Sequence, residues 1–297
     1  MHRIARIAIA ALASVGMLAS VAACGNGQST SEKNGTIEVA ASVNQWGTVA
    51  KALGGDNVNV TSIINSTNVD AHDYEPTTSD IAKLQKAQVI IVNGAGYDAW
   101  AVKATQTANA TIVNAAEIGG VNDGENPHVW FSADVRKAVA QAITEAYEQA
   151  DAAKKNDFDK MNDQWTAEEN NVESKIAEVK QKTDGLTYAA TESVASYLAE
   201  DMGLANATPS GYARATANES EPTPTDIKQF TDALKAGEIK LLVVNTQEES
   251  ELTDKITDAA KSVEVPMVEL TEQMPEQYDS LTAWMEDLVD AFSQAIA

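Results

Sequence analysis

The stretch Val89-Ile90-Ile91-Val92-Asn93 is an uninterrupted apolar run that ends in a polar residue, and Gly94 and Gly96 follow it closely. Such a run is typical of a strand that is covered on both faces, because neither face carries polar side chains. The two glycines predict a turn into a helix around Trp100 and Val102. A buried strand followed by a helix is the repeating unit of a parallel sheet, so this stretch predicts an α/β fold.

The same alternation of strand and helix extends along the chain in both directions. Short apolar runs predict further strands at residues 37–41, 58–64, 111–113, 186–190, 241–245 and 265–270. Amphipathic stretches predict helices at residues 78–86, 134–149, 193–202, 225–236, 249–262 and 281–296. Residues 205–224 are rich in turn formers and show no periodicity. The pattern predicts two lobes, each a mainly parallel sheet flanked by helices.

A longer helix is predicted between these two sets of elements. Its apolar residues recur at steps of three, four or seven among charged ones: Phe158, Met161, Trp165, Val172, Ile176 and Val179. This spacing indicates an amphipathic helix of about 25 residues, longer than an ordinary crossover helix. We expect it to join the lobes rigidly, although a surface helix of a single domain would have the same periodicity.

The first residues have the pattern of a secretory leader. Arg3 and Arg6 precede the apolar residues 7–18, and small residues precede Cys24, the only cysteine of the chain. This predicts a lipoprotein signal peptide at residues 1–23 and lipid on Cys24. An ordinary signal with an incidental cysteine is the alternative.

The composition after Cys24 predicts how the rest of the chain is held and divided. Residues 24–35 are rich in Gly, Ser, Asn and Thr and predict a flexible tether. Beyond it we expect an N-terminal lobe at 36–150, the long helix at 151–183 and a C-terminal lobe at 184–297. No later apolar run approaches the ~20 residues that a membrane span needs, so the lipid is expected to be the only membrane anchor.

The overall charge excludes one class of partner. The chain has 21 basic and 44 acidic residues and a formal net charge of −23. A protein that binds nucleic acid needs basic patches to meet the phosphates, so nucleic acid is not expected as a partner.

Two histidines remain once the leader is set aside, and both lie in loop-like contexts. His72 lies in the segment 69–77, and His128 lies in Asn126-Pro127-His128-Val129-Trp130. Neutral imidazole is the commonest metal ligand in proteins, and open α/β sheets bind ligands beyond the carboxyl ends of their strands. The two histidines therefore predict a metal site, although a single loop histidine is more often solvated or hydrogen-bonded.

The second half of the chain has no histidine, so carboxylates must complete such a site. Glu192 follows the predicted strand 186–190, and Glu272 follows the predicted strand 265–270. Glu192 has the alternative role of an acid at a helix N-terminus, which the helix dipole favours. Glu272 has the alternative role of a solvated loop acid. Other acids compete for the position of Glu272: Glu269, Glu248 and Glu249.

The sequence resembles the solute-binding lipoproteins of bacterial zinc and manganese ABC importers over nearly all of its length after the leader. The segments that carry the resemblance are 72–76, 79–81, 92–100, 126–130 and 221–224. The resemblance implies two α/β lobes, a rigid long helix between them and a metal in the cleft. It also implies His72, His128 and Glu192 as ligands, with Glu272 at a fourth position that the family usually fills with Asp.

What the resemblance implies about function is capture of one Zn²⁺ or Mn²⁺ ion and its delivery to an ABC permease. We expect a monomer without enzymatic activity, anchored by lipid to the outer face of the cell membrane. The choice between zinc and manganese stays open, because the chain lacks the His-rich acidic loop of many zinc-specific members.

Three other functions are weighed against this one. A surface adhesion or interaction lipoprotein of the same fold would use the metal only for structure. A metallohydrolase would keep a coordination position open for water, but the chain has no HExxH helix. A binder of organic ligands would need arginines, and Arg136 and Arg214 are the only ones after the leader.

Overall fold

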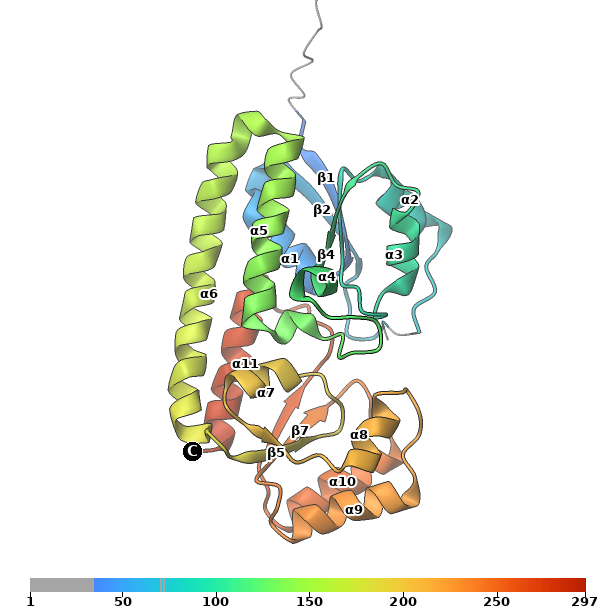
Figure 1. Cartoon of the computed structure of the whole chain (residues 1–297), viewed down its shortest axis with the longest axis vertical. Coiled ribbons are helices and arrows are strands. Elements are labelled where there is room, and N and C mark those ends of the chain that lie inside the picture. Colours follow the sequence, from blue (N-terminus) through green and yellow to red (C-terminus); the bar gives the residue numbers. More distant parts are fainter. Residues whose placement is uncertain (1–34, 70, 72) are drawn as a thin grey trace, which may run out of the picture. The chain divides into compact units, whose positions relative to one another are not determined.

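Two parallel four-stranded sheets form the framework of the computed structural model, which describes residues 35–69, 71 and 73–297. The first sheet has the order β2-β1-β3-β4, and the second has the order β6-β5-β7-β8 (Figure 1). We call the parts built on them the N-terminal and C-terminal lobes. The strands of the first are β1 (Ile37–Val43), β2 (Val58–Ile64), β3 (Val89–Val92) and β4 (Thr111–Asn114). Those of the second are β5 (Thr187–Ala190), β6 (Ala205–Asn206), β7 (Leu241–Asn245) and β8 (Met267–Leu270). The predicted fold class is confirmed.

Helices cover both faces of the N-terminal sheet, as the apolar run of β3 predicts. Val89 and Ile91 belong to the core that includes α1 (Asn44–Gly54) and α5 (Ala133–Ala150). Ile90 and Val92 point the other way, to α2 (Thr78–Lys86) and α3 (Ala99–Thr105). Because successive side chains of a strand face opposite sides, a strand in the middle of this sandwich must be apolar throughout.

The C-terminal sheet is covered in the same way. Leu242 and Val244 of β7 pack with α9 (Pro224–Lys235) and α10 (Glu251–Ser262). Leu241 and Val243 join the larger core, which also contains residues of α7 (Ser196–Asp201) and α11 (Leu281–Ala295). Both lobes therefore have the strand order and helical layers of a doubly wound sheet, with a switch point between their first and third strands.

The long helix α6 (Lys155–Thr183) has 29 residues and connects the two lobes. It packs against α5 and α1 of the first lobe and against α11, so Figure 1 shows it alongside elements of both. Five of the six residues that predicted it are buried, namely Phe158, Trp165, Val172, Ile176 and Val179, and Met161 is partly buried. One apolar core runs through the interface, since Val39 and Val243 belong to the same cluster. A shared core of this kind resists wide separation of the lobes.

The structure corrects the sequence reading between residues 205 and 224. That segment contains the short strand β6 and the helix α8 (Ser210–Thr216), neither of which was predicted. The strand has only two residues, and both are exposed, so it carries no alternating pattern of burial. The helix buries only Tyr212 and has too few apolar residues for a periodicity to emerge.

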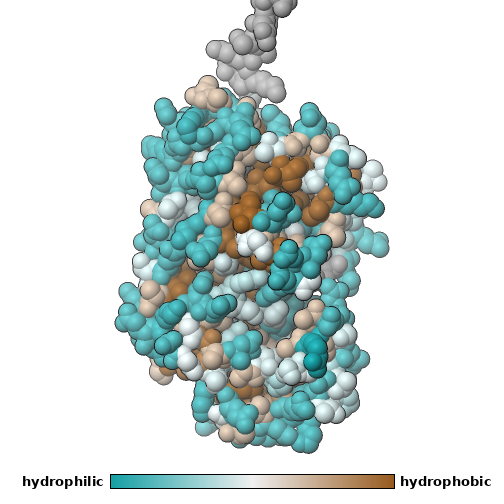
Figure 2. Space-filling view, in the orientation of Figure 1, coloured by the Kyte–Doolittle hydropathy of each residue, from teal (hydrophilic) through white to brown (hydrophobic). Residues whose placement is uncertain are grey.

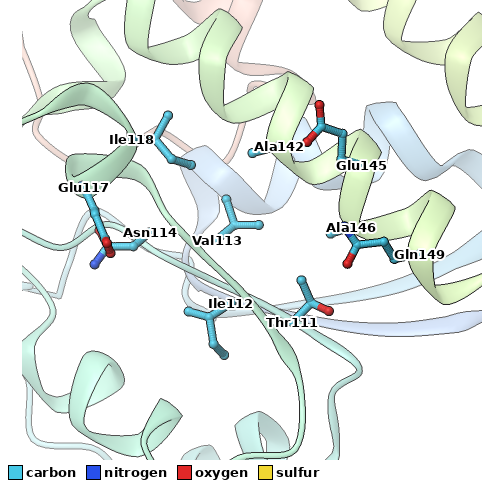
Figure 3. A pocket seen from close by; sticks show the side chains of 10 residues that line it. All are labelled: Thr111, Ile112, Val113, Asn114, Glu117, Ile118, Ala142, Glu145, Ala146 and Gln149. Carbon is cyan, nitrogen blue, oxygen red and sulfur yellow. The ribbon is translucent and has the colours of Figure 1, made fainter.

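A shallow groove of about 380 Å³ opens at the edge of the N-terminal sheet, beside β4. Figure 3 shows its lining, which comes from β4, α4 (Ala115–Gly119) and α5. Ile112 and Ile118 are 39% and 38% exposed there, and Figure 2 shows apolar surface on the N-terminal lobe. The predicted metal ligands that the structure describes, His128, Glu192 and Glu272, do not line this groove. Among the described residues, no helix combines the length and apolar composition needed to cross a membrane.

A buried ion pair links α5 to α6. The Arg136 guanidinium is fully buried, and its Nε lies 3.0 and 3.1 Å from the two carboxylate oxygens of Glu169. Its Nη1 donates to the Trp130 carbonyl at 3.0 Å, in the short helix that follows His128. Buried charges are tolerated when both are paired and hydrogen-bonded, and removal of one leaves the other uncompensated.

We therefore expect Glu169→Ala to lower the free energy of unfolding by about 3–5 kcal/mol, because the buried guanidinium of Arg136 loses its counter-charge. Urea denaturation followed by circular dichroism measures this loss. Asp232→Ala is the control, since Asp232 pairs with Lys228 on an exposed helix face. Such a pair contributes only about 0.3–0.5 kcal/mol. Equal losses in the two variants would contradict the role given to the buried pair.

Candidate metal centre

His128 lies at the start of the short helix Val129–Phe131, in the connection between α4 and α5. The side chain is only 2% exposed. Its ring meets the rings of Trp130 and Tyr97 edge-on, with centroid separations of 5.3 and 5.9 Å. These contacts fix the plane of the imidazole, so that one ring nitrogen, Nε2, faces the C-terminal lobe.

Two carboxylates of the C-terminal lobe meet that nitrogen. Nε2 of His128 lies 3.0 Å from Oε1 of Glu272 and 3.9 Å from Oε1 of Glu192. Glu192 follows β5, and Glu272 follows β8, so both occupy the strand ends where the sequence placed them. Glu272 is 3% exposed, which is unusual for a carboxylate outside an ion pair or a metal site.

The three ligand atoms have the spacing of a shared ion. One atom from each of His128, Glu192 and Glu272 lies within 4.8 Å of the others. A tetrahedral ion with bonds of about 2.0 Å separates its ligands by about 3.3 Å. The distances from Nε2 of His128 to Oε1 of Glu272 and of Glu192, 3.0 and 3.9 Å, lie on either side of that value. Within the described residues these are the three side chains that could hold a metal together.

The competing acids lie differently. Glu269 is on β8 but points to solvent, between the buried residues Val268 and Leu270. Glu248 and Glu249 are also exposed. Strand alternation explains the contrast for Glu269, because its neighbours in the strand face the core. The structure thus brings Glu272, and not these acids, beside His128.

Two predicted functional residues lie outside the described residues. These are His72, predicted as a ligand, and Cys24, predicted as the lipid attachment site. Both assignments stay predictions.

The segment that follows residue 72 is anchored at the start of α2. Thr77 is the N-cap, and Thr77 and Asp80 form a reciprocal capping box. Asp80 also accepts a hydrogen bond from the Tyr74 hydroxyl at 2.8 Å. Burial raises the pKa of Tyr74 to about 12, and the hydrogen bond to Asp80 adds to this effect. Tyr74 therefore helps to fix the loop that precedes α2.

We expect Asp80→Ala to lower the free energy of unfolding by about 1–2 kcal/mol, because the start of α2 loses the half of the capping box that the Asp80 carboxylate supplies and the hydrogen bond from Tyr74. Hydrogen bonds, first that from Thr77, hold the pKa of Asp80 well below its usual value. A carboxyl with a lowered pKa stabilises the fold above its unfolded pKa of about 3.9, and this contribution is lost as the pH falls further.

The gap between wild type and Asp80→Ala should therefore narrow below about pH 4, which denaturation at several pH values measures. Asp226→Ala is the matched control, because Asp226 forms the same box with Thr223 at α9 but accepts no tyrosine hydroxyl. A loss in Asp80→Ala no larger than in this control would contradict the contribution of Tyr74.

Two polar residues around the site, Tyr97 and Asn245, were not predicted from the sequence to have a function. Tyr97 is buried, its hydroxyl is hydrogen-bonded to Glu272, and it also accepts from the side-chain amide of Gln273. Burial raises the pKa of Tyr97 well above its usual range, and the charge of Glu272 raises it further. The tyrosine thus stays protonated and can donate to the carboxylate. Its place in the loop after β3, a strand end like those of the glutamates, is the signal that could have found it.

Asn245 is a second such residue, at the end of β7. Its Nδ2 donates to Oε2 of Glu192 at 2.6 Å. This bond crosses the switch point between β5 and β7 and leaves Oε1 of Glu192 directed at His128. The amide therefore holds the carboxylate in one orientation, as partners of metal ligands commonly do.

A family model described as ZnuA, zinc-uptake complex component A periplasmic, matches residues 39–295. The chain belongs to the ZnuA family. It is similar to the metal ABC transporter substrate-binding lipoprotein FimA of Streptococcus parasanguinis, with 24% identity over 272 residues, 85% of each chain. It is also similar to the high-affinity zinc uptake system protein ZnuA of Bacillus subtilis (strain 168), with 22% identity over 260 residues, 80% of each chain.

Solved structures share the ZnuA-family fold of this chain. The periplasmic zinc binding protein TroA of Treponema pallidum aligns with a TM-score of 0.74 and 15% identity, covering 89% of this chain and all of that one. Zn(II)-bound AdcA of Streptococcus pneumoniae aligns with a TM-score of 0.70 and 20% identity, covering 88% of this chain and 58% of that one. The recognition made from the sequence motifs is confirmed.

Proposed function

We propose that this protein binds one divalent transition metal ion, Zn²⁺ or Mn²⁺, outside the cytoplasm and delivers it to the permease of an ABC importer. The observation that carries the proposal is the meeting of His128 from one lobe with Glu192 and Glu272 from the other. Membership of the ZnuA family supports it. The relatives also support it, because they include a substrate-binding lipoprotein of a metal ABC transporter and a protein of a zinc uptake system.

The proposed ligands suit such an ion chemically. His128, Glu192, Glu272 and His72 would supply two neutral imidazoles and two carboxylates, whose charge balances that of M²⁺. Imidazole favours zinc and carboxylate oxygen favours manganese, so the mixed set accepts either. Four single contacts would give the tetrahedral arrangement of zinc, whereas two-oxygen binding by the glutamates would raise the coordination number.

Delivery requires that the bound state be opened. The ligands come from both lobes, so the ion ties the lobes together when it is bound. Side-chain amides of the N-terminal lobe add further ties: Nδ2 of Asn44 donates to the Met274 carbonyl at 2.7 Å, and Nε2 of Gln45 donates to the Glu272 carbonyl at 3.0 Å. We infer that the permease must break these contacts to release the metal, and that the protein itself acts as a binder and not as an enzyme.

Glu272→Gln should lower the affinity for zinc and manganese by more than about 100-fold. Loss of a residue that only hydrogen-bonds to a metal ligand typically costs about 10–100-fold in affinity, and this variant removes the charge of a proposed ligand itself. Calorimetric titration of the metal-free protein measures it. Metal at 100 times its dissociation constant should also add about 2.7 kcal/mol to the wild-type free energy of unfolding. Glu269→Gln, on the exposed face of β8, is the control. Wild-type affinity in Glu272→Gln would contradict the proposed site.

We further propose that residues 1–23 are removed, that Cys24 carries lipid and that residues 24–35 tether the body to the outer face of the membrane. Beyond the tether we propose the division into an N-terminal lobe at 36–150, the connecting helix at 151–183 and a C-terminal lobe at 184–297. The protein is proposed to act as a monomer. The leader pattern and the lipoproteins among its relatives support the anchor.

Cys24→Ala should release the protein from the membrane into the medium, because the variant has no thiol to which the proposed lipid could be attached. Fractionation of the native host with antibody detection checks this, together with mass spectrometry of the wild-type N-terminus. Ser29→Ala, in the same tether, serves as the control. A variant at position 24 that stays with the membrane fraction would overturn the proposed anchor.

A further inference from the structure

The side chain of Asn126 touches both halves of the proposed metal centre. Its Oδ1 accepts from the backbone N–H of His128 at 3.1 Å and lies 2.7 Å from the ring atom Nδ1 of the same residue. Its Nδ2 donates to the carbonyl of Ser193 at 2.8 Å, in the C-terminal lobe. Ser193 directly follows Glu192, so one amide group contacts the segment of a ligand in each lobe.

The partners of Asn126 fix which way its amide points. A backbone N–H needs an acceptor and a carbonyl needs a donor, so Oδ1 must face His128 and Nδ2 must face Ser193. Reversal of the amide would place two donors together on one side and two acceptors on the other. The orientation therefore follows from the surrounding groups, although the two ends of an amide have the same shape.

This orientation of the Asn126 amide determines which ring nitrogen of His128 carries a hydrogen. An amide oxygen can only accept, so Nδ1 of His128 must carry the hydrogen that it receives. Nε2 lies 3.0 Å from the Glu272 carboxylate, which also only accepts, so the lone pair of the neutral ring is free on Nε2 when an ion in the proposed site takes the place of the Nε2 hydrogen. A hydrogen bond at one ring nitrogen is the usual means by which proteins direct the other nitrogen to a metal.

A second contact joins the same loop to the C-terminal lobe. The hydroxyl of Tyr197 donates to the backbone carbonyl of Asn126 at 2.8 Å. Asn126 is thus held through its side chain by Ser193 and through its backbone by Tyr197. Glu192 is held on its far side by Asn245. The position of the imidazole relative to the Glu192 segment therefore depends on Asn126.

We propose that Asn126 is a positioning residue that sets the ring tautomer of His128 and aligns the ring with the Glu192 segment across the two lobes. It acts through these neighbours and does not itself bind the ion. The inference rests on the proposed metal-binding function. Loss of Asn126 should shorten the time for which the metal is retained, because Nδ1–H of His128 loses its acceptor and one tie between the lobes is gone.

Four variants of the mature protein test this proposal. Asn126→Ala removes both contacts, whereas Asn126→Asp keeps an acceptor for Nδ1–H and loses the donor to Ser193. Tyr197→Phe removes the second tie without touching the ring. Asn122→Ala is the matched control, because Asn122 lies in the same loop and is hydrogen-bonded to Glu125.

Two measurements separate the two roles. The first is NMR of protein labelled with ¹⁵N-histidine and loaded with zinc, in which the Nδ1–H signal of His128 and its exchange with water are observed. The second is the rate at which a chelator removes zinc. The Nδ1–H signal reports the tautomer and its hydrogen bond directly, and a merely structural role of Asn126 would not move it.

We expect Asn126→Ala to lose protection of the Nδ1–H signal and to bind zinc about 10–100-fold more weakly. Asn126→Asp should keep the signal, with a zinc release rate between those of wild type and Asn126→Ala. Tyr197→Phe should keep the signal and release zinc faster than wild type, and Asn122→Ala should match wild type in both measurements.

A protected Nδ1–H signal in Asn126→Ala, with zinc release within twofold of wild type, would overturn the proposal. Loss of the signal in Asn126→Asp as complete as in Asn126→Ala would overturn the role in the tautomer even if the alanine variant folds poorly. A wild-type protein that binds neither zinc nor manganese would instead overturn the proposed function. The two failures are therefore distinguishable.

Discussion

A buried carboxylate of one lobe faces a buried imidazole of the other, and the rest of the structure depends on this pairing. Glu272 and His128 are both almost fully inaccessible, with 3.0 Å between their nearest atoms. Burial of a carboxylate is costly unless a counter-charge, hydrogen bonds or a metal compensates it. The lobes can stay together around such a group only where partners are supplied, and the site supplies them through Tyr97 and through the proposed ion. Stability and ligand capture are thus two aspects of one electrostatic constraint.

In this fold the apolar core and the polar loops at the strand ends have separate functions. The apolar core, which runs from Val39 to Val243 and includes α6, keeps the lobes in a fixed relation. The strand ends then present short polar loops to one another, where a ligand can be held without disturbing the core. Asn245 and Asn126 contact the proposed ligands Glu192 and His128 on the side away from the proposed ion. Precision at the centre therefore comes from amide hydrogen bonds and rigidity from buried helices.

Much of this architecture could be predicted from the sequence, because the buried positions of helices and strands give recognisable patterns of apolar residues. The apolar run of β3 and the spacing of apolar residues in α6 are such patterns, whereas β6 and α8 are too short and too exposed to show one. The strand-end rule and the family motifs indicated His128, Glu192 and Glu272. The place of Tyr97 after a strand end could have indicated it, but its bond to Glu272 and the proposed role of Asn126 could not be predicted, because they depend on distances between segments that are remote in the chain and on the direction of single hydrogen bonds.

Four of the amides that join the lobes have main-chain carbonyls as acceptors, whereas Gln273 donates to the side-chain hydroxyl of Tyr97. Asn44, Gln45 and Asn126 donate to the carbonyls of Met274, Glu272 and Ser193, and Gln247 donates back to the carbonyl of Thr67. Every residue type carries a carbonyl, so the accepting positions can change their side chains without loss of the bond. In these four bonds a specific residue type is needed only at the donor. Sequence drift at positions such as 193 and 274 is therefore compatible with an unchanged closed arrangement, and relatives can share this interface at low sequence identity.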